Sequence, residues 1–345
     1  MHQTLSAPPP DVDAQEAADL AARHFGLEVA DVRLLTAERD QNLRLKTADG
    51  RNWVMKLANP NEDPGLTDFQ TQALVHLARA GGDLPLPRLL HAPGGAPSVQ
   101  VELGDGRRSV MRVLSWVEGE PLSQVGRSGP QRRALARVLA RLGQAFRGFS
   151  HPAQGAYMQW DIAKIDRIAH LLPHVPDAAD RARVAEVLAA FEREVKPALP
   201  GLRRQVIYND LNPFNVLVEP EDHDRISGII DFGDITEAPF INDLAVAAAY
   251  QFGPEGGIEE VAQFIAAYAE VERPTEAEAR LLPWLIACRL AMTLLITGYR
   301  AGLHPENAPY ILRNAGPSRV GLASLLSRSP DQNIEWVFAA LEESK

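Results

Sequence analysis

Apolar and polar residues alternate with a period of two over much of the chain between residues 32 and 117. The alternating runs are residues 32–37, 41–47, 53–58 and two stretches within 98–117. This alternation predicts half-buried strands, and the Asp-Gly pair in the turn after the second run predicts a tight hairpin. Residues 66–80 interrupt the alternation with a helical period and end at a Gly-Gly pair. Two hairpins with a helix between them predict a small α+β lobe.

The pattern changes to a helical period after residue 117. Helices are predicted at residues 130–149, 161–171, 176–195, 241–252, 257–271 and 276–302. One more amphipathic helix, residues 13–26, precedes the strands and ends at Gly26. We therefore expect a disordered tail at 1–12, a sheet lobe at 13–117 and a larger helical lobe at 118–345.

Composition narrows the class of protein. The chain of 345 residues is 46% hydrophobic and 23% charged, which is typical of a globular protein, and its net charge of −10 argues against non-specific binding of nucleic acid. The apolar stretch 281–296 is short for a membrane span and contains Arg289, so a buried helix is the better interpretation. The single cysteine and the absence of a signal-peptide pattern indicate a cytoplasmic protein without a membrane partner.

Candidate chemistry is concentrated in residues 207–234. Asp210 is followed five positions later by Asn215, and a predicted hairpin then leads to Asp231, which begins an Asp-Phe-Gly sequence. The two strand-like runs are centred on His223, so antiparallel pairing would place Asn215 opposite Asp231, roughly 5 Å away. That separation suits two oxygen ligands that share a Mg²⁺ ion at about 2.1 Å each. An ordinary hairpin with polar ends is the alternative.

The spacing resembles the phosphotransfer pattern of protein kinases. In that pattern the first Asp orients and deprotonates the acceptor hydroxyl, and the Asn and the second Asp hold Mg²⁺. The pattern implies that Asp210 is the catalytic base and that Asn215 and Asp231 are the metal ligands. It also requires a cation for the nucleotide phosphates, and Lys56 in a predicted strand is the candidate.

Further nucleotide contacts follow from the same comparison. Gln70 on the predicted helix is the best-placed partner for Lys56, and Asp68 is the second choice. Gln41 and Asn42 lie at the tip of the first hairpin, where a phosphate or plain solvent could meet them. The connector between the lobes would offer backbone groups of Ser115 and Val117 to the purine of ATP or GTP, and the sequence does not distinguish these donors.

Several longer motifs resemble the aminoglycoside phosphotransferase and choline kinase-like superfamily, and within it the hydroxylysine kinases and related amino-alcohol kinases. The motifs are ERDQN (38–42), MKLANPNED (55–63), FQTQAL (69–74), NDLNPFNVLV (209–218), SGIIDFGD (227–234) and RLAMTLLITGYRAGLHPENAPYI (289–311). The resemblance implies an α+β, bilobal, protein-kinase-like fold that transfers a γ-phosphate to a hydroxyl. One departure is Tyr208, because the family usually has a histidine two residues before the catalytic Asp.

Residues that could contact the acceptor come from the helical lobe. Arg289 stands alone in an apolar helix and could grip a carboxylate, or it could form a structural salt bridge, for example to Asp243 or Glu237. Asp161 could bind an ammonium group, although helix capping is the better interpretation. Asp234 could bind a cationic acceptor or support the metal loop. Tyr299 and Arg300 are weaker pocket candidates.

Three functions remain open from the sequence. The first is a kinase for an amino alcohol or hydroxy-amino acid, with hydroxylysine as the leading acceptor. The second is the same chemistry on homoserine, ethanolamine or an aminoglycoside. The third is a nucleotide-binding pseudokinase, which Tyr208 and Gln70 would favour and which the intact trio of Asp210, Asn215 and Asp231 opposes. In each case we expect a monomer or a homodimer.

Overall fold

The computed structural model describes residues 8–37, 39–253 and 256–343. Within these residues the chain divides into two compact units, and each is presented by itself. Unit 1 contains the described residues up to Glu118 together with Phe149–Ala156. Unit 2 contains Gly119–Gly148 and the described residues from Tyr157 onwards.

A short segment, Phe149–Ala156, belongs to unit 1, although the sequence placed it in the helical lobe. The ring of Phe149 stacks on Phe69 with centroids 5.9 Å apart, and the ring of His151 stacks on Phe69 at 5.5 Å. His151 Nε2 also lies 3.1 Å from Asp68 Oδ2. These are long-range contacts, so no local sequence pattern could have indicated them.

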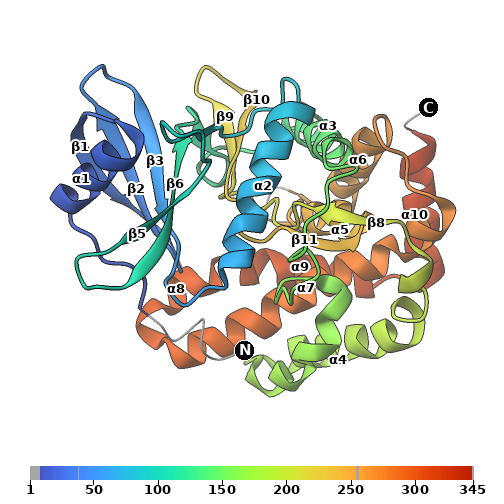
Figure 1. The fold of residues 1–345 in the computed structure, drawn as a ribbon. Helices are drawn as coiled ribbons and strands as arrows, with labels where there is room; N and C mark the ends of the chain where they lie inside the picture. Colours follow the sequence, from blue (N-terminus) through green and yellow to red (C-terminus); the bar gives the residue numbers. More distant parts are fainter. Residues whose placement is uncertain (1–7, 38, 254–255, 344–345) are drawn as a thin grey trace. The chain divides into compact units, whose positions relative to one another are not determined.

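Unit 1 is built on an antiparallel sheet with the strand order β1-β2-β3-β6-β4, and β5 pairs with β6. Figure 1 labels β1, β2, β3, β5 and β6 of this sheet. The predicted alternating runs all form strands of this sheet. The strands are β1 (Val29–Leu35), β2 (Gln41–Thr47), β3 (Asn52–Leu57), β4 (Leu89–Leu90), β5 (Val99–Glu102) and β6 (Arg108–Ser115). Each described pairing is antiparallel, which confirms the expectation of hairpins without a parallel crossover.

The two helices of unit 1 begin and end where the sequence has capping residues. Helix α1 (Ala14–Phe25) has Asp13 as its N-cap, and Gly26 closes it in the left-handed region at φ 67°. Helix α2 (Pro64–Ala80) begins at Asp63, whose side chain accepts a hydrogen bond from Gly65 N–H.

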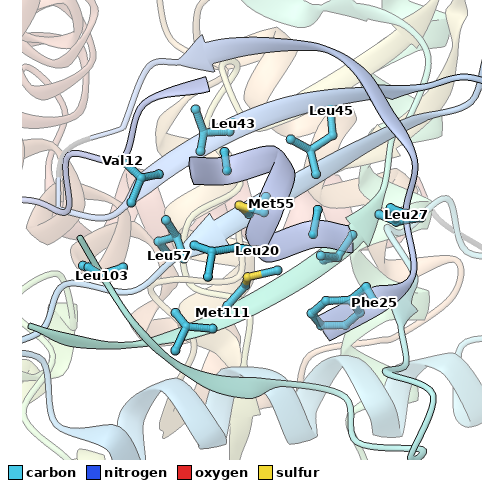
Figure 2. Packing of buried hydrophobic residues seen from close by; sticks show 14 residues of the cluster. Val12, Leu20, Phe25, Leu27, Leu43, Leu45, Met55, Leu57, Leu103 and Met111 are labelled. Carbon is cyan, nitrogen blue, oxygen red and sulfur yellow. The ribbon is translucent and has the colours of Figure 1, made fainter. Parts of the chain in front are cut away.

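Alternation gives the sheet two different faces. One face packs its leucine and methionine side chains against α1, as Figure 2 shows for Leu43, Leu45, Met55 and Met111 around Leu20. These side chains are at most 4% exposed. Successive side chains of a strand point to opposite faces of the sheet. The intervening residues therefore form the face that points away from α1, and this face includes polar side chains.

The end of the predicted disordered tail differs from expectation. Residues 1–7 lie outside the described part of the chain, but Val12 is 4% exposed and packs in the core of unit 1. The Gln41 side chain forms two hydrogen bonds with the backbone of Val12. Its Oε1 accepts from Val12 N–H at 2.9 Å, and its Nε2 donates to Val12 O at 2.9 Å. Gln41 therefore attaches the chain before α1 to the sheet, and both ends of its amide are already used.

Strands make up a minor part of unit 2. A hairpin of β9 and β10 is extended by β7, and β8 pairs with β11. The strands are β7 (Glu120–Pro121), β8 (Arg204–Ile207), β9 (Val216–Glu219), β10 (Asp222–Ile229) and β11 (Thr236–Pro239). The β9–β10 hairpin is the one predicted at the centre of the chemical motif.

Helices form the rest of unit 2, and the longest of them, α7 (Glu276–Leu303), lies at its centre. The other α-helices of the described part of unit 2 are α3 (Gly129–Ala145), α4 (Ala178–Ala190), α5 (Ile241–Ala249), α6 (Ile258–Ala269), α8 (Ala308–Ile311), α9 (Ala315–Leu326) and α10 (Pro330–Glu342). A π-helical turn, η3 (Phe191–Val195), continues α4, and the 3₁₀ segments are η1 (Leu122–Gln124), η2 (Ile162–His174), η4 (Leu199–Gly201), η5 (Pro305–Asn307) and η6 (Leu312–Asn314).

Helix α7 is apolar enough and long enough to cross a membrane by length and composition alone. In the structure, 89% of its most apolar window is buried inside the protein. Helices α5, α9 and α10 pack against it. This is the environment of a core helix, as the sequence predicted.

The amide of Gln41 generates the first prediction. Gln41→Leu should lower the free energy of unfolding by about 1–3 kcal/mol, because both hydrogen-bonding groups of the Val12 backbone lose their partner in a buried place. Denaturant titration measures this difference. Gln15→Leu, on the exposed face of α1, is the matched control. A Gln41→Leu variant as stable as the wild type, with weakened nucleotide binding, would contradict the structural role.

Candidate active site

The loop between β8 and β9 contains the predicted base, Asp210. It leaves β8 through Asn209, which is fully buried and adopts a left-handed conformation with φ 68°. The Asp243 carboxylate, in the first turn of α5, accepts from Asn209 N–H at 2.7 Å and from Tyr208 N–H at 3.2 Å. Asp243 therefore anchors the loop.

Hydrogen bonds hold both oxygens of the Asp210 carboxylate. Oδ2 accepts from Asn212 Nδ2 at 2.8 Å and from Asn215 Nδ2 at 2.8 Å. Oδ1 accepts from Arg289 Nη2 at 3.0 Å. The side chain is 18% exposed, so the carboxylate is held firmly and still reaches the surface of unit 2.

The protonation of Asp210 reflects opposing influences. Burial raises its pKa to about 7, and the negative charge of Asp234 acts in the same direction. The Arg289 guanidinium and the hydrogen bond from Asn212 oppose the rise in pKa. A carboxylate with a raised pKa is a stronger base than an ordinary aspartate, which suits a group that takes a proton from a hydroxyl.

The hairpin register differs from the predicted one by a residue. Asn215 O accepts from Ile230 N–H at 2.9 Å, and Val216 pairs with Ile229, so Asn215 lies opposite Ile230 and not opposite Asp231. The cause is irregular pairing within β10, where the register shifts twice between Asp222 and Gly228. The prediction paired residues at equal distances from His223. A bulge places an extra residue on one strand, so the residues beyond it no longer pair in that way.

Asn215 and Asp231 still present oxygen donors. The Asn215 amide donates through Nδ2 to Asp210, which leaves Oδ1 as its acceptor atom. Asp231 is exposed and leaves the strand in a left-handed conformation with φ 60°. Among the described residues, no group of three or more His, Cys, Asp or Glu side chains could hold a metal. One amide oxygen and one carboxylate suit a hard cation such as Mg²⁺, which completes its coordination with water and phosphate oxygens.

Tyr208 supports the loop where the superfamily usually has a histidine. Its hydroxyl donates a hydrogen bond to Ile230 O, directly before Asp231. Its ring meets Phe232 edge to face with centroids 5.1 Å apart. The tyrosine therefore connects the β8–β9 loop, which contains Asp210, to the Asp-Phe-Gly segment through a hydrogen bond and a ring contact.

The predicted acceptor residues have different fates. Asp161 is 1% exposed, caps η2 by accepting from Ala163 N–H at 3.0 Å and forms an ion pair with Lys164 at 2.9 Å, which confirms the capping interpretation. Asp234 lies close enough to Asp210 to influence its pKa. Arg289 does form a salt bridge, but its partner is Asp210.

The partners proposed for Arg289 from the sequence were wrong. Asp243 binds backbone N–H groups, and Glu237 lies 3.5 Å from Arg204. Sequence spacing could not identify Asp210 as the partner, because 79 residues separate the two side chains.

In unit 1, Lys56 stands in a polar row that crosses three strands. Asn42 of β2 is its cross-strand neighbour on one side, and Arg112 of β6 is its neighbour on the other. Cross-strand neighbours share a face, so this row lies on the face opposite the leucine and methionine core. Arg112 is 2% exposed and was missed from the sequence, since an arginine in an alternating strand has no distinguishing signal.

Other residues predicted to contact the nucleotide have partners within unit 1. Gln70 Oε1 accepts from Arg112 Nη1 at 3.1 Å, so Gln70 helps to position Arg112, the cross-strand neighbour of Lys56. Its pairing with Lys56 stays a prediction. Asp68, the second choice, pairs with His151. In the connector, Ser115 N–H donates to Arg88 O at 2.8 Å and its hydroxyl accepts from Arg88 N–H at 2.9 Å. The backbone N–H of Ser115 is therefore already used as a donor. The contact of the Val117 backbone with the purine stays a prediction.

The comparison with known families agrees with this geometry. Residues 31–284 match the model of the phosphotransferase enzyme family. The chain belongs to that family. This phosphotransferase is accordingly a kinase that acts on a hydroxyl group of a small molecule.

Similar proteins extend over nearly the whole phosphotransferase chain. Hydroxylysine kinase of Mus musculus is 26% identical over 333 residues, which are 90% of this chain and 88% of the relative. A structure of a microcompartment-associated aminopropanol kinase has a TM-score of 0.69 at 19% identity and covers 91% of this chain and 98% of its own. An amicoumacin kinase solved in complex with AMP-PNP, Ca²⁺ and Ami has a TM-score of 0.65 at 13% identity, and the match covers 91% of this chain and 97% of the other. These likenesses confirm the predicted kinase-like fold.

The hydroxyl of Tyr208 generates the second prediction. Tyr208→Phe should keep the ring contact with Phe232, lower the free energy of unfolding by about 1–2 kcal/mol and reduce kcat, because Ile230 O loses its donor. Steady-state kinetics and thermal unfolding measure the two effects. Tyr310→Phe, at an exposed tyrosine of α8, is the control. Unchanged stability and kcat in Tyr208→Phe would show that the hydroxyl does not support the loop.

Proposed function

We propose that this kinase transfers the γ-phosphate of ATP or GTP to the hydroxyl of a hydroxy-amino acid or an amino alcohol, with hydroxylysine as the first acceptor to test. The support from relatives is the likeness to hydroxylysine kinase along 90% of this chain. The observation that carries the proposal is the Asp210 carboxylate, oriented by Asn212, Asn215 and Arg289 and raised in pKa.

The charge around Asp210 favours an acceptor that carries an ammonium group. Asp234 and Asp231 both raise the pKa of Asp210, so negative charge is concentrated near the base. Arg289 balances part of this charge. An amino alcohol or amino acid would bring a positive charge to the remainder, whereas an acidic acceptor would be repelled.

Each chemical role has a proposed residue. Asp210 orients the acceptor hydroxyl and receives its proton. Asn215 and Asp231 would hold Mg²⁺, which when bound neutralises phosphate charge. In unit 1, Lys56 would contact the phosphates, with Asn42 beside it, and Val117 would offer backbone groups to the base of the nucleotide. The described Gln41 contacts argue against a direct role in nucleotide binding.

The setting of the enzyme is also a proposal. The net charge of −10 is unfavourable for binding nucleic acid. One buried cysteine, Cys288, suits a reducing compartment, so we propose a cytoplasmic enzyme that acts without a membrane partner. Its oligomeric state is proposed to be a monomer or a homodimer.

Asp210→Ala tests the base. Turnover should fall by about 10³-fold, within the range for loss of a general base, while the affinity for Mg-nucleotide changes little. Coupled kinase assays and calorimetry measure turnover and binding. Asp331→Ala, an exposed aspartate on α10, is the control and should behave like the wild type. Retained turnover in Asp210→Ala would remove the residue from the mechanism.

Asp231→Asn tests the metal site. The Mg²⁺ concentration for half-maximal activity should rise by at least about tenfold, because a neutral amide replaces a charged ligand of a hard cation. Titration of Mg²⁺ at fixed nucleotide measures the shift. Asp222→Asn, exposed at the start of β10, is the control. An unchanged Mg²⁺ requirement would exclude Asp231 as a ligand.

A panel of acceptors tests the substrate. Wild-type protein is assayed with hydroxylysine, homoserine, ethanolamine, aminopropanol and aminoglycosides, each with ATP and with GTP. Highest kcat/KM on a hydroxy-amino acid or an amino alcohol supports the proposal. Highest kcat/KM on an aminoglycoside would contradict it, and nucleotide binding without transfer to any acceptor would favour the pseudokinase alternative.

A further inference from the structure

Arg289 is a buried cation with several partners in unit 2. It lies in the middle of α7 and is 2% exposed. Its Nη2 donates to Asp210 Oδ1 at 3.0 Å and to the Tyr250 hydroxyl at 2.8 Å, and its Nη1 donates to Trp160 O at 3.3 Å. The guanidinium carbon also lies 4.7 Å from the centre of the Trp160 ring and 5.4 Å from that of Tyr250.

The hydrogen bonds leave one free direction on the carboxylate of Asp210. An ionised carboxylate has about four lone-pair sites, two on each oxygen. Asn212 and Asn215 occupy the two sites of Oδ2, and Arg289 occupies one site of Oδ1. Within the described structure, the remaining site is therefore on Oδ1, the oxygen that Arg289 holds.

We propose that Arg289 is a positioning residue that aligns Oδ1 of Asp210 as the atom that receives the acceptor's proton. In the transfer step the acceptor oxygen forms a bond to the γ-phosphorus, and its proton moves to Oδ1. The bond from the γ-phosphorus to the bridging oxygen breaks, and the nucleoside diphosphate leaves with that electron pair. Arg289 fixes the rotation of the carboxylate and does not touch the acceptor.

The surroundings of Arg289 make it suitable for this task. Its backbone belongs to the core helix α7, and the two aromatic rings and the Trp160 carbonyl restrict the guanidinium. An arginine presents its donors in a rigid planar arrangement, whereas a lysine ammonium rotates freely. A buried cation also needs a counter-charge, and Asp210 provides it.

A different role for Arg289 would be to grip the carboxylate of an amino-acid acceptor. Its Nε has no hydrogen-bond partner among the described residues, which would allow such a contact. The two roles predict different substrate dependence. A positioning residue affects every acceptor equally, but a carboxylate-binding residue affects only acceptors that have a carboxylate.

The experiment compares Arg289→Met and Arg289→Lys on two acceptors, one with a carboxylate and one without, taken from those that the wild type phosphorylates. Slow transfer to water, measured as phosphate release from Mg-ATP alone, gives a readout that does not depend on the acceptor proposed above. Arg280→Met is the matched control, since Arg280 is on the same helix, is exposed and pairs with Glu276. Circular dichroism and thermal unfolding check that each variant is folded.

The expected result is a fall in kcat of about 100-fold in Arg289→Met, with the same fall on both acceptors and in transfer to water, and with acceptor KM within about threefold. Arg289→Lys should recover about tenfold, because charge returns without the planar donor geometry. Arg280→Met should match the wild type. A loss confined to the carboxylate-bearing acceptor, or carried by KM alone, would overturn the proposal.

Tyr250→Phe provides a second test should Arg289→Met fail to fold. It removes one hydrogen bond to Arg289 and keeps the charge and the ring. We expect kcat to fall by about 3–10-fold on both acceptors with KM unchanged, in keeping with the loss of one ordinary hydrogen bond. A Tyr250→Phe variant with wild-type kcat on both acceptors would contradict positioning through Arg289.

Discussion

The arrangement of the loop that contains Asp210 depends on a single buried carboxylate, that of Asp243. It is 1% exposed and accepts hydrogen bonds from two successive backbone N–H groups, those of Tyr208 and Asn209. Burial raises the pKa of Asp243 to about 6, while these two bonds oppose the rise. They also hold Asn209 in the left-handed conformation. The chain turns there, and the Asp210 carboxylate lies within hydrogen-bonding distance of the Asn212 and Asn215 amides.

Charge compensation organises the next level of the site. Asp210, Asp231 and Asp234 bring negative charges close together, and each neighbouring carboxylate makes ionisation of Asp210 less favourable. Arg289 offsets part of this repulsion from within the core. The remaining negative charge would suit a metal ion and the ammonium group of the proposed acceptor.

The sequence predicted what local rules determine, and long-range contacts account for most of its errors. The alternating strands, the capped helix α1 and the spacing of Asp210, Asn215 and Asp231 are local features, and they were recognised. The hairpin register was wrong by one residue because the bulges in β10 leave no clear signal in composition. The partners of Arg289 and Gln41 depend on which elements pack together, which spacing along the chain does not encode. Asp161, by contrast, was correctly assigned as a cap because capping is local.

The tyrosine before the catalytic loop has a consequence for tolerance of acid. An imidazole at this position would change its charge near its ordinary pKa of about 6.5, and its hydrogen bonding would change with it. Burial and the surrounding carboxylates raise the pKa of Tyr208 well above the ordinary value for a phenol. The hydroxyl therefore remains a neutral donor to Ile230 O throughout the physiological range. The hydrogen bond that attaches the Asp-Phe-Gly segment at this point is therefore not lost through titration of its donor when the surrounding pH falls.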